Sequence, residues 1–272
     1  DALTREMKTN SLYDYIFLCF FLGNDFMPHF PSVNIRTKGI DIMLSAYKTT
    51  LTKTETLTDN GRKINWKNVR KLIMYLAENE WKNLMAEYKI REKWERRKID
   101  DDKMNKYLHI PTKNREIEKY IDPTINGWEL RYYKTLFGFD ITETKKQQIC
   151  VNFLEGLEWT MRYYIEGCVD WNWCYHYDYP PLWKDLIKFV PYFDTIMIEP
   201  NDHTPVSKMV QLAYVLPITS RYLLPDEISD KLSKEEAYGC LWAFCKYFWE
   251  AHIQLPQIDI QELSNLINNI KT

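Results

Sequence analysis

Asp25 is the carboxylate in this sequence that is best placed to do chemistry. It lies in the motif GNDF at residues 23–26, directly after the apolar run YIFLCFFL at residues 15–22. A buried element on one side would fix its position, and a fixed carboxylate can bind a divalent metal ion. One carboxylate cannot hold Mg2+ alone, because this ion takes several oxygen ligands. An Asp after a buried helix also commonly caps the next turn. A metal site that includes Asp25 therefore requires ligands from elsewhere.

A stretch of aromatic residues is the second feature that could act chemically. Residues 159–193 hold 12 aromatic side chains in 35 positions, out of 12 Phe, 19 Tyr and 10 Trp in the whole chain. Such rings can stack on nucleic-acid bases, but they also dominate the buried area of protein cores. Within the stretch, Tyr alternates with His176 and Asp178, which predicts an extended segment with one buried face. The sequence leaves both roles open.

The charged residues exclude some classes of protein. The 272 residues include 36 Lys and Arg against 38 Asp and Glu, and the net charge of −2 disfavours a uniformly basic nucleic-acid surface, although local patches remain compatible with it. The basic run at residues 89–98 could contact phosphates. Because Glu92 and Glu95 interrupt it, the run is more typical of an exposed, charge-laced helix. The acidic run at residues 100–102 is predicted to be solvated.

Composition predicts a globular chain that does not span a membrane. The chain is 45% hydrophobic and 27% charged, which argues against disorder. Its longest apolar run, residues 15–22, is shorter than the roughly 20 residues that cross a bilayer. No secretory leader is recognisable. The six cysteines form no CxxC pair, so we expect free thiols in a reducing, intracellular compartment, with cytoplasm and nucleus not distinguished.

The apolar periodicity predicts a mainly α fold with few short strands. Helices are predicted at residues 12–22, 40–48, 66–98, 127–138, 143–167, 209–216, 234–249 and 263–270, and one short strand at residues 195–200. The first of these segments is also compatible with a buried strand. The helix at residues 66–98 loses its apolar stripe in its second half, so we expect it to project from the core or to fray. Residues 49–62 and 99–126 are predicted to form an exposed connection and a surface linker.

Five segments, in this order along the chain, resemble those of the Xrn-type 5'→3' exoribonucleases. They are DYIFLCFFLGNDFMPHFPSVNIRTKGID (residues 14–41), GWELRYYKTLFG (127–138), FLEGLEWTMRYYIEGCVDWNW (153–173), TPVSKMVQLAYVLP (204–217) and WEAHIQLPQIDIQEL (249–263). The GND turn is also similar to the GxDY turn of flap-type nucleases. The resemblance covers nearly the whole chain. One departure is that residues 173–181 are WCYHYDYPP, where the family has WYYPYHYAP.

This resemblance implies a fold and a division of the chain. The expected fold is the C-terminal part of an α/β nuclease core of the PIN and flap-nuclease type. Residues 1–50 would end the metal-binding nuclease domain, residues 51–126 would form a long helix and a linker, and residues 127–272 would form a helical, aromatic-rich second conserved region. The chain begins with Asp1 rather than Met, and we interpret it as a segment of a longer polypeptide.

The resemblance also implies an activity. Such enzymes degrade single-stranded RNA that carries a 5'-monophosphate, by two-metal hydrolysis with Mg2+ or Mn2+. Asp25 would be the last carboxylate of the metal site, and the other ligands would lie in an N-terminal region outside this chain. Trp171 and Trp173, together with Tyr175 and Tyr177, are the candidates for stacking on RNA. This segment alone is expected to be inactive.

Two other functions remain compatible with the sequence. The parent protein could be a non-catalytic relative that binds RNA or a protein partner through the same scaffold. Alternatively, the chain could be a subunit that completes its site with another polypeptide. Neither alternative involves a membrane. The residues that precede Asp1 in the parent protein would distinguish an enzyme from the non-catalytic relative, because an enzyme needs further carboxylates and a basic phosphate pocket there. Co-expression of the upstream part, with Asp25→Ala as the variant, would test the subunit.

Overall fold

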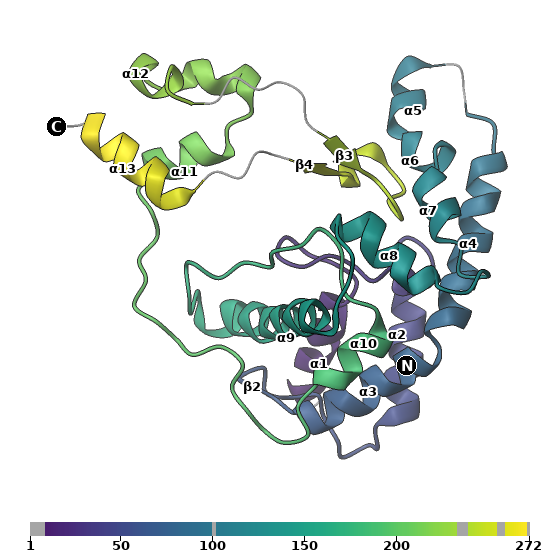
Figure 1. Ribbon diagram of the computed structural model, residues 1–272. Coiled ribbons are helices and arrows are strands. Elements are labelled where there is room, and N and C mark those ends of the chain that lie inside the picture. Colours follow the sequence, from purple (N-terminus) through teal and green to yellow (C-terminus); the bar gives the residue numbers. More distant parts are fainter. Residues whose placement is uncertain (1–8, 100–101, 233–238, 255–258, 271–272) are drawn as a thin grey trace. The chain divides into compact units, whose positions relative to one another are not determined.

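The computed structural model describes residues 9–99, 102–232, 239–254 and 259–270 and divides the chain into two compact units (Figure 1). Unit 1 comprises Asp1–Asn201 and Trp242–Glu250, and unit 2 comprises Asp202–Leu241 and Ala251–Thr272. Helices predominate in both units, which confirms the predicted mainly α class.

Unit 1 contains ten α-helices and further short elements among its described residues. The α-helices are α1 (Thr9–Phe20), α2 (Gly39–Thr50), α3 (Trp66–Glu78), α4 (Glu80–Arg96), α5 (Lys103–Leu108), α6 (Ile110–Lys113), α7 (Glu116–Ile121), α8 (Trp128–Phe137), α9 (Glu143–Glu166) and α10 (Trp183–Phe189). The 3-10 helices are η1 (Pro31–Val33) and η3 (Phe248–Glu250), and strands β1 (Thr58–Asp59) and β2 (Lys63–Ile64) form an antiparallel hairpin.

Unit 2 is smaller. Its described elements are α11 (Lys208–Val215), η2 (Ile218–Leu223), α12 (Asp226–Ser229), β3 (Gly239–Leu241), β4 (His252–Gln254) and α13 (Ile260–Ile270). The strands β3 and β4 pair antiparallel, with Cys240 opposite Ile253. The core lies between α11, α12 and α13, where Val210, Ile228 and Ile267 are buried.

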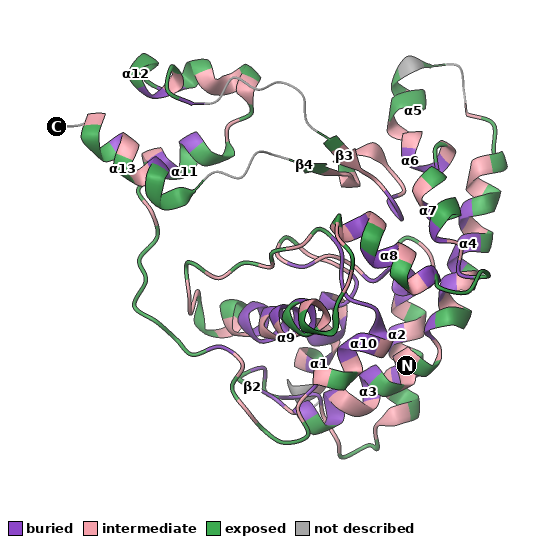
Figure 2. Cartoon of the chain, in the orientation of Figure 1, coloured by how far each residue is buried: buried purple, intermediate pink, exposed green. Residues whose placement is uncertain are grey.

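The core of unit 1 is built around α9 and α10. Helix α10 packs on both α3 and α9, and α1 packs on α9, so buried residues line the inward faces of these helices (Figure 2). The rings of Phe17, Phe21 and Phe30 are almost completely buried there, and Phe30 stacks on Trp183 with ring centroids 3.6 Å apart. The apolar run at residues 15–22 thus forms the second half of α1 and the turn that follows it, and most of it is buried, so a helix is confirmed but ends at Phe20.

The Thr-rich connection at residues 49–62 is only partly exposed, contrary to the prediction. Its last part is tied to the buried carboxylate of Asp14, which accepts hydrogen bonds from the backbone N–H groups of Leu57 (2.9 Å) and Thr58 (2.8 Å). The Tyr47 hydroxyl also donates to this carboxylate (2.8 Å). A buried carboxylate is tolerated because several donors surround it, and α1 thereby fixes β1.

The predicted single helix at residues 66–98 is wrong in one respect, because it divides into α3 and α4 at Asn79. This residue has φ −100° and ψ 3°, and its side-chain amide donates to the carbonyl of Tyr75 (2.8 Å). The next residue, Glu80, is buried and accepts from the backbone N–H groups of Trp183 (2.9 Å) and Lys184 (3.2 Å) at the start of α10. The division between α3 and α4 thus lies next to the contact with α10.

The charged half of α4 and the linker at residues 99–126 also differ from expectation. Arg91 is fully buried and pairs with Glu118 of α7 (2.5 Å), and Arg115 pairs with the same carboxylate (2.6 Å). Residues 99–126 contain α5, α6 and α7. Because α7 binds α4 through Arg91 and Glu118, α4 neither projects from the core nor frays at Arg91.

Of the acidic run at residues 100–102, Asp100 and Asp101 lie outside the described residues. Asp102 is exposed and caps α5 through the N–H of Met104 (3.2 Å).

Two further predictions of secondary structure are corrected. Residues 195–200 form no strand, because Glu158 and Arg162 of α9 bind the backbone of Met197 and Ile198 instead of a neighbouring strand (2.9 and 3.0 Å). The helix predicted at residues 234–249 begins outside the described residues. Its described part is β3, a turn with Phe244 at φ 64°, and η3.

All six cysteines are free thiols, as expected. Burial raises the pKa of the Cys150 thiol well above its usual value. This side chain therefore packs in the core and does not act as a nucleophile. In the described part of the chain, no helix combines the length and the apolar character that crossing a membrane requires.

Candidate functional site

The GNDF motif forms a tight turn that presents Asp25. The side chain of Asn24 accepts hydrogen bonds from the backbone N–H groups of Phe26 (2.8 Å) and Met27 (2.9 Å), and the N–H of Asn24 donates to the carbonyl of Met27 (3.0 Å). Gly23 has φ +91°, a conformation that favours glycine. The turn directs Asp25 outward, and its side chain is exposed.

An exposed carboxylate on a rigid turn is a suitable ligand for a hard cation such as Mg2+. The turn provides one such group. Among residues 9–99, 102–232, 239–254 and 259–270, no group of three or more His, Cys, Asp or Glu side chains could hold a metal ion. The described residues therefore form no complete metal centre, and the metal-binding role of Asp25 stays a prediction.

The turn abuts a cluster of four aromatic side chains, which we call the aromatic stack: Phe26, Trp159, Tyr163 and Trp173. Trp159 stacks on Tyr163 with centroids 5.2 Å apart and an interplanar angle of 9°, and on Trp173 at 5.2 Å and 25°. Phe26 packs edge-on against Trp159 (4.9 Å) and Tyr163 (5.1 Å). Asp25 directly precedes Phe26 in the chain, so one turn carries both the exposed carboxylate and an edge of the aromatic stack.

A glycine sets how closely α9 approaches this site. A Cβ added to Gly156 would lie 2.3 Å from the Met27 sulfur and 2.8 Å from the ring of Trp173, which is far inside van der Waals contact. The indole N–H of Trp159 donates to the carbonyl of Asp170 (2.9 Å). The stack is thus held from both sides, by α9 and by the segment that follows it.

Asn152 anchors the aromatic segment to α9. Its amide donates to the carbonyl of Cys174 (3.2 Å) and its oxygen accepts from the N–H of His176 (3.0 Å). The Cys174 sulfur lies 3.3 Å from the Nδ1 of His176, but burial raises the pKa of this thiol. A raised pKa disfavours the thiolate form that nucleophilic catalysis requires.

The structure places the four predicted stacking residues in different environments. Trp171 is 52% exposed. Trp173 is half-buried in the stack, and its indole N–H has no hydrogen-bond partner among the described residues. Tyr175 contacts Phe153 edge-on (5.5 Å) and donates from its hydroxyl to the carbonyl of Tyr179 (2.8 Å), so it serves the packing of this segment.

Tyr177 is half-buried and contacts Phe137 (5.5 Å). The partial or full burial of Tyr175, Tyr177 and Tyr179, with His176 and Asp178 exposed, confirms the predicted extended segment with one buried face. Beside it lies a cavity of about 470 Å3 whose polar lining includes Gln147, Gln148, Asn152, Glu155 and His176.

Sequence reasoning missed three members of the stack as site residues. Trp159 and Tyr163 are four positions apart on α9, a spacing that places two side chains on one helix face, so this signal was available. No local sequence pattern indicated Phe26, because its partner Trp159 lies more than 130 positions later in the chain.

Comparison with known proteins identifies the family. The chain matches the model of the Xrn1 helical domain over residues 8–123 and 101–272. It is 25% identical over 342 residues to 5'-3' exoribonuclease 2 of Gallus gallus, covering 96% of this chain and 35% of the relative. The matching protein of Arabidopsis thaliana is 24% identical (78% of this chain and 29% of the relative). The homolog from Drosophila melanogaster is 27% identical (84% and 30%).

The chain thus spans about a third of the length of the curated relatives it matches. The family match extends from the GNDF turn through α9 and the aromatic segment to α13, and it includes every residue of the site described above. This protein is a member of the Xrn family and contains its helical domain.

Proposed function

We propose that this chain is part of a 5'→3' exoribonuclease that degrades single-stranded RNA with a 5'-monophosphate. The observation that carries the proposal is the junction of an exposed carboxylate with an aromatic stack in one rigid turn, at Asp25 and Phe26. The relatives are named 5'-3' exoribonucleases. Metal-dependent cleavage of RNA needs carboxylates at the reacting phosphate, and a single strand is held by stacking.

In the proposed mechanism Asp25 is one ligand of a two-metal site that holds Mg2+ or Mn2+. When bound, these ions would activate water and stabilise the leaving oxygen of the terminal nucleotide. Asp25 offers the oxygen donor that such ions prefer, but the remaining ligands must come from outside the described residues. The role of the chain itself is to hold this carboxylate still, which the side chain of Asn24 does through two backbone N–H groups.

The aromatic segment would guide the RNA strand. Trp171 is exposed and can offer a ring face to a base, whereas Trp173 is fixed within the stack and would form the wall behind it. Each base stacked on an aromatic ring contributes about 1–3 kcal/mol. Tyr175 and Tyr177 pack on Phe153 and Phe137 and would hold the segment that follows Trp173 in place.

The proposal extends to the domain organisation. Residues 1–50 would complete an α/β nuclease domain of the PIN and flap-nuclease type, and the helical remainder would form its second conserved region. This assignment predicts that the residues preceding this segment in the parent protein contain the missing carboxylates and a basic pocket for the 5'-phosphate.

The experiment is a comparison of substrates in the complete protein that contains this chain. Degradation of a 5'-monophosphorylated single-stranded RNA should depend on Mg2+ or Mn2+ and should exceed degradation of the 5'-hydroxyl RNA and of a duplex. Trp171→Ala should raise the KM for RNA, and Trp171→Phe should retain most of the affinity. Absence of activity on every RNA would favour the non-catalytic RNA- or partner-binding relative. Activity that appears only after addition of a second polypeptide would favour the alternative in which this chain is a subunit that completes its site with another polypeptide.

A further inference from the structure

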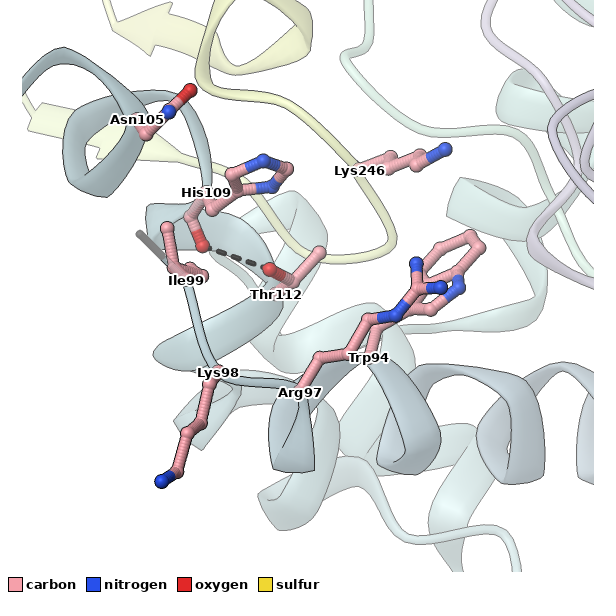
Figure 3. Close-up of a pocket in the computed structure, with 8 residues that line it drawn as sticks. All are labelled: Trp94, Arg97, Lys98, Ile99, Asn105, His109, Thr112 and Lys246. Atoms are coloured by element: carbon pink, nitrogen blue, oxygen red, sulfur yellow. Dashed lines mark hydrogen bonds between the residues drawn. The ribbon is translucent and has the colours of Figure 1, made fainter. Parts of the chain in front are cut away.

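A cavity of about 330 Å3 in unit 1 shares no lining residue with the aromatic stack. The end of α4, the helices α5 and α6, and the loop that carries Lys246 enclose it (Figure 3). Its volume lies at the lower end of the range for sites that bind small molecules. Nothing in the proposed nuclease mechanism uses this cavity.

The lining of this cavity is cationic. Arg97, Lys98 and Lys246 contribute three positive side chains, and no carboxylate is among the lining residues. In the described part of the chain, none of the three forms an ion pair. Two other basic residues, Arg115 and Lys119, both pair with Glu95. Among the described residues, no carboxylate therefore compensates the positive charge of this lining.

Lys246 is held in place rather than free in solvent. Its Nζ lies 5.0 Å from the ring centroid of Trp94 and 4.9 Å from that of Tyr247, which are cation–π distances. Its backbone N–H donates to the Glu250 carboxylate (2.8 Å), and that carboxylate is itself paired with Arg36 (2.6 Å). The loop thus fixes Lys246 while leaving its ammonium charge unneutralised.

Figure 3 separates the basic residues into two groups. The cationic ends of Arg97 and Lys246 lie on the Trp94 side of the cavity, although they come from different segments of the chain, whereas the Lys98 side chain extends away from them. Asn105 adds an amide to the lining. A guanidinium and an ammonium on the same side of a cavity suit the oxygens of a phosphate group.

We propose that this cavity binds a phosphate group, carried either by a free nucleoside monophosphate or by a strand of RNA. Arg97 and Lys246 supply the charge, and Trp94 positions Lys246 by its ring. Because the cavity is separate from the aromatic stack, the proposal holds whether or not the protein hydrolyses RNA.

The test measures binding to the complete protein in EDTA, which prevents metal-dependent hydrolysis. One arm titrates adenosine 5'-monophosphate by calorimetry, and the other titrates a 5'-hydroxyl single-stranded RNA by fluorescence anisotropy. Arg97→Ala and Lys246→Ala should each weaken binding of at least one ligand about tenfold. Lys98→Ala removes the same charge from a side chain that points away, so it should change either affinity less than about twofold.

The two arms distinguish the source of the phosphate. A loss confined to the monophosphate identifies a free nucleotide, and a loss confined to RNA, with a salt dependence reduced by about one phosphate contact, identifies the strand. Unchanged affinities for both ligands in Arg97→Ala and Lys246→Ala would overturn the proposal. An equal loss in Lys98→Ala would also overturn it, because the effect would then be one of general charge. Arg97 and Lys98 are exposed, so their variants should fold.

Discussion

Gly156 is the residue on which the geometry of the aromatic stack depends most directly. Gly156→Ala would place a methyl group where the Met27 sulfur and the Trp173 ring already lie. Overpacking of this kind typically costs about 1–3 kcal/mol. We expect a free energy of unfolding lower by this amount in urea denaturation, with a changed near-UV circular dichroism signal from the displaced indole. Ser45→Ala, at an exposed position of α2, is the control. Equal stabilities for the two variants would contradict the close contact between α9 and the stack.

Arg91 is the residue for which sequence and structure differ most. In the sequence it belongs to a charged run typical of a solvated helix face, but it is fully buried and donates to Glu118 and to the Cys245 carbonyl (2.8 Å). Arg91→Ala leaves the Glu118 carboxylate buried with one cation fewer, so we expect a loss of about 3–5 kcal/mol in the free energy of unfolding.

The matched control for Arg91 is Arg96, on the same helix. Its side chain is 82% exposed and its nearest carboxylate oxygen, on Glu92, is 3.9 Å away. Surface pairs of this kind contribute at most about 1 kcal/mol, so Arg96→Ala should be nearly neutral. Both variants are compared by urea denaturation. Similar losses for Arg91→Ala and Arg96→Ala would show that α4 is solvated at both positions.

At the scale of elements, local signals predicted the helices that end on glycine. Gly138 at φ 74° and Gly167 at φ 96° terminate α8 and α9 close to the predicted boundaries, because a left-handed C-cap is encoded by the residue itself. The break between α3 and α4 was not predictable in this way. It depends on Glu80, which binds the backbone of α10 103 positions later in the chain. Contacts between residues so far apart in the sequence do not affect the local spacing of apolar residues from which helices are predicted.

The contact between α4 and α10 gives a prediction about pH. Burial raises the pKa of Glu80 from 4.5 to about 8, although the N–H groups of Trp183 and Lys184 oppose the shift. Between these values the folded state binds more protons than the unfolded state, so this group makes stability fall as pH rises. The decline is at most about 1.4 kcal/mol per pH unit.

Glu80→Gln removes this titration. The variant should lose less stability than the original protein between pH 5 and pH 8 (roughly the interval between the two pKa values), as measured by urea denaturation at several pH values. Equal declines in the variant and the original protein would mean that the buried carboxylate is ionised and stabilised by its two N–H donors throughout this range.

At the scale of the whole molecule, the sequence predicted the class and the family better than the site. The motif at residues 23–26 and the aromatic segment were recognisable from the sequence as candidate regions, because both are continuous in the chain. The assembly of Phe26 with Trp159 and Trp173 required the fold, since α9 brings together two segments that no local pattern connects. The linker was misjudged for the same reason, because the partners of Arg115 and Glu118 lie in α4 and in the loop before η3.

The chain by itself should be inactive. Its described residues contain no group of three metal-ligating side chains, and one carboxylate cannot assemble a two-metal site. The isolated 272-residue chain, incubated with 5'-monophosphorylated RNA and Mg2+, is expected to release no nucleotides. Degradation that required Mg2+ and persisted after further purification of the chain would refute this expectation.

The most direct test of the proposed metal-binding role is the rate of RNA degradation by the complete protein with Asp25→Asn, which keeps the shape of the side chain but removes its charge. We predict a fall of at least about a hundredfold, because a metal ligand contributes several kcal/mol to the transition state. Asp140→Ala, at a carboxylate that is 85% exposed, should retain full activity. The free energy of unfolding should be unchanged in both variants. A rate within about twofold of the original for Asp25→Asn, with Mg2+ still required, would remove Asp25 from the metal site and contradict the proposed mechanism.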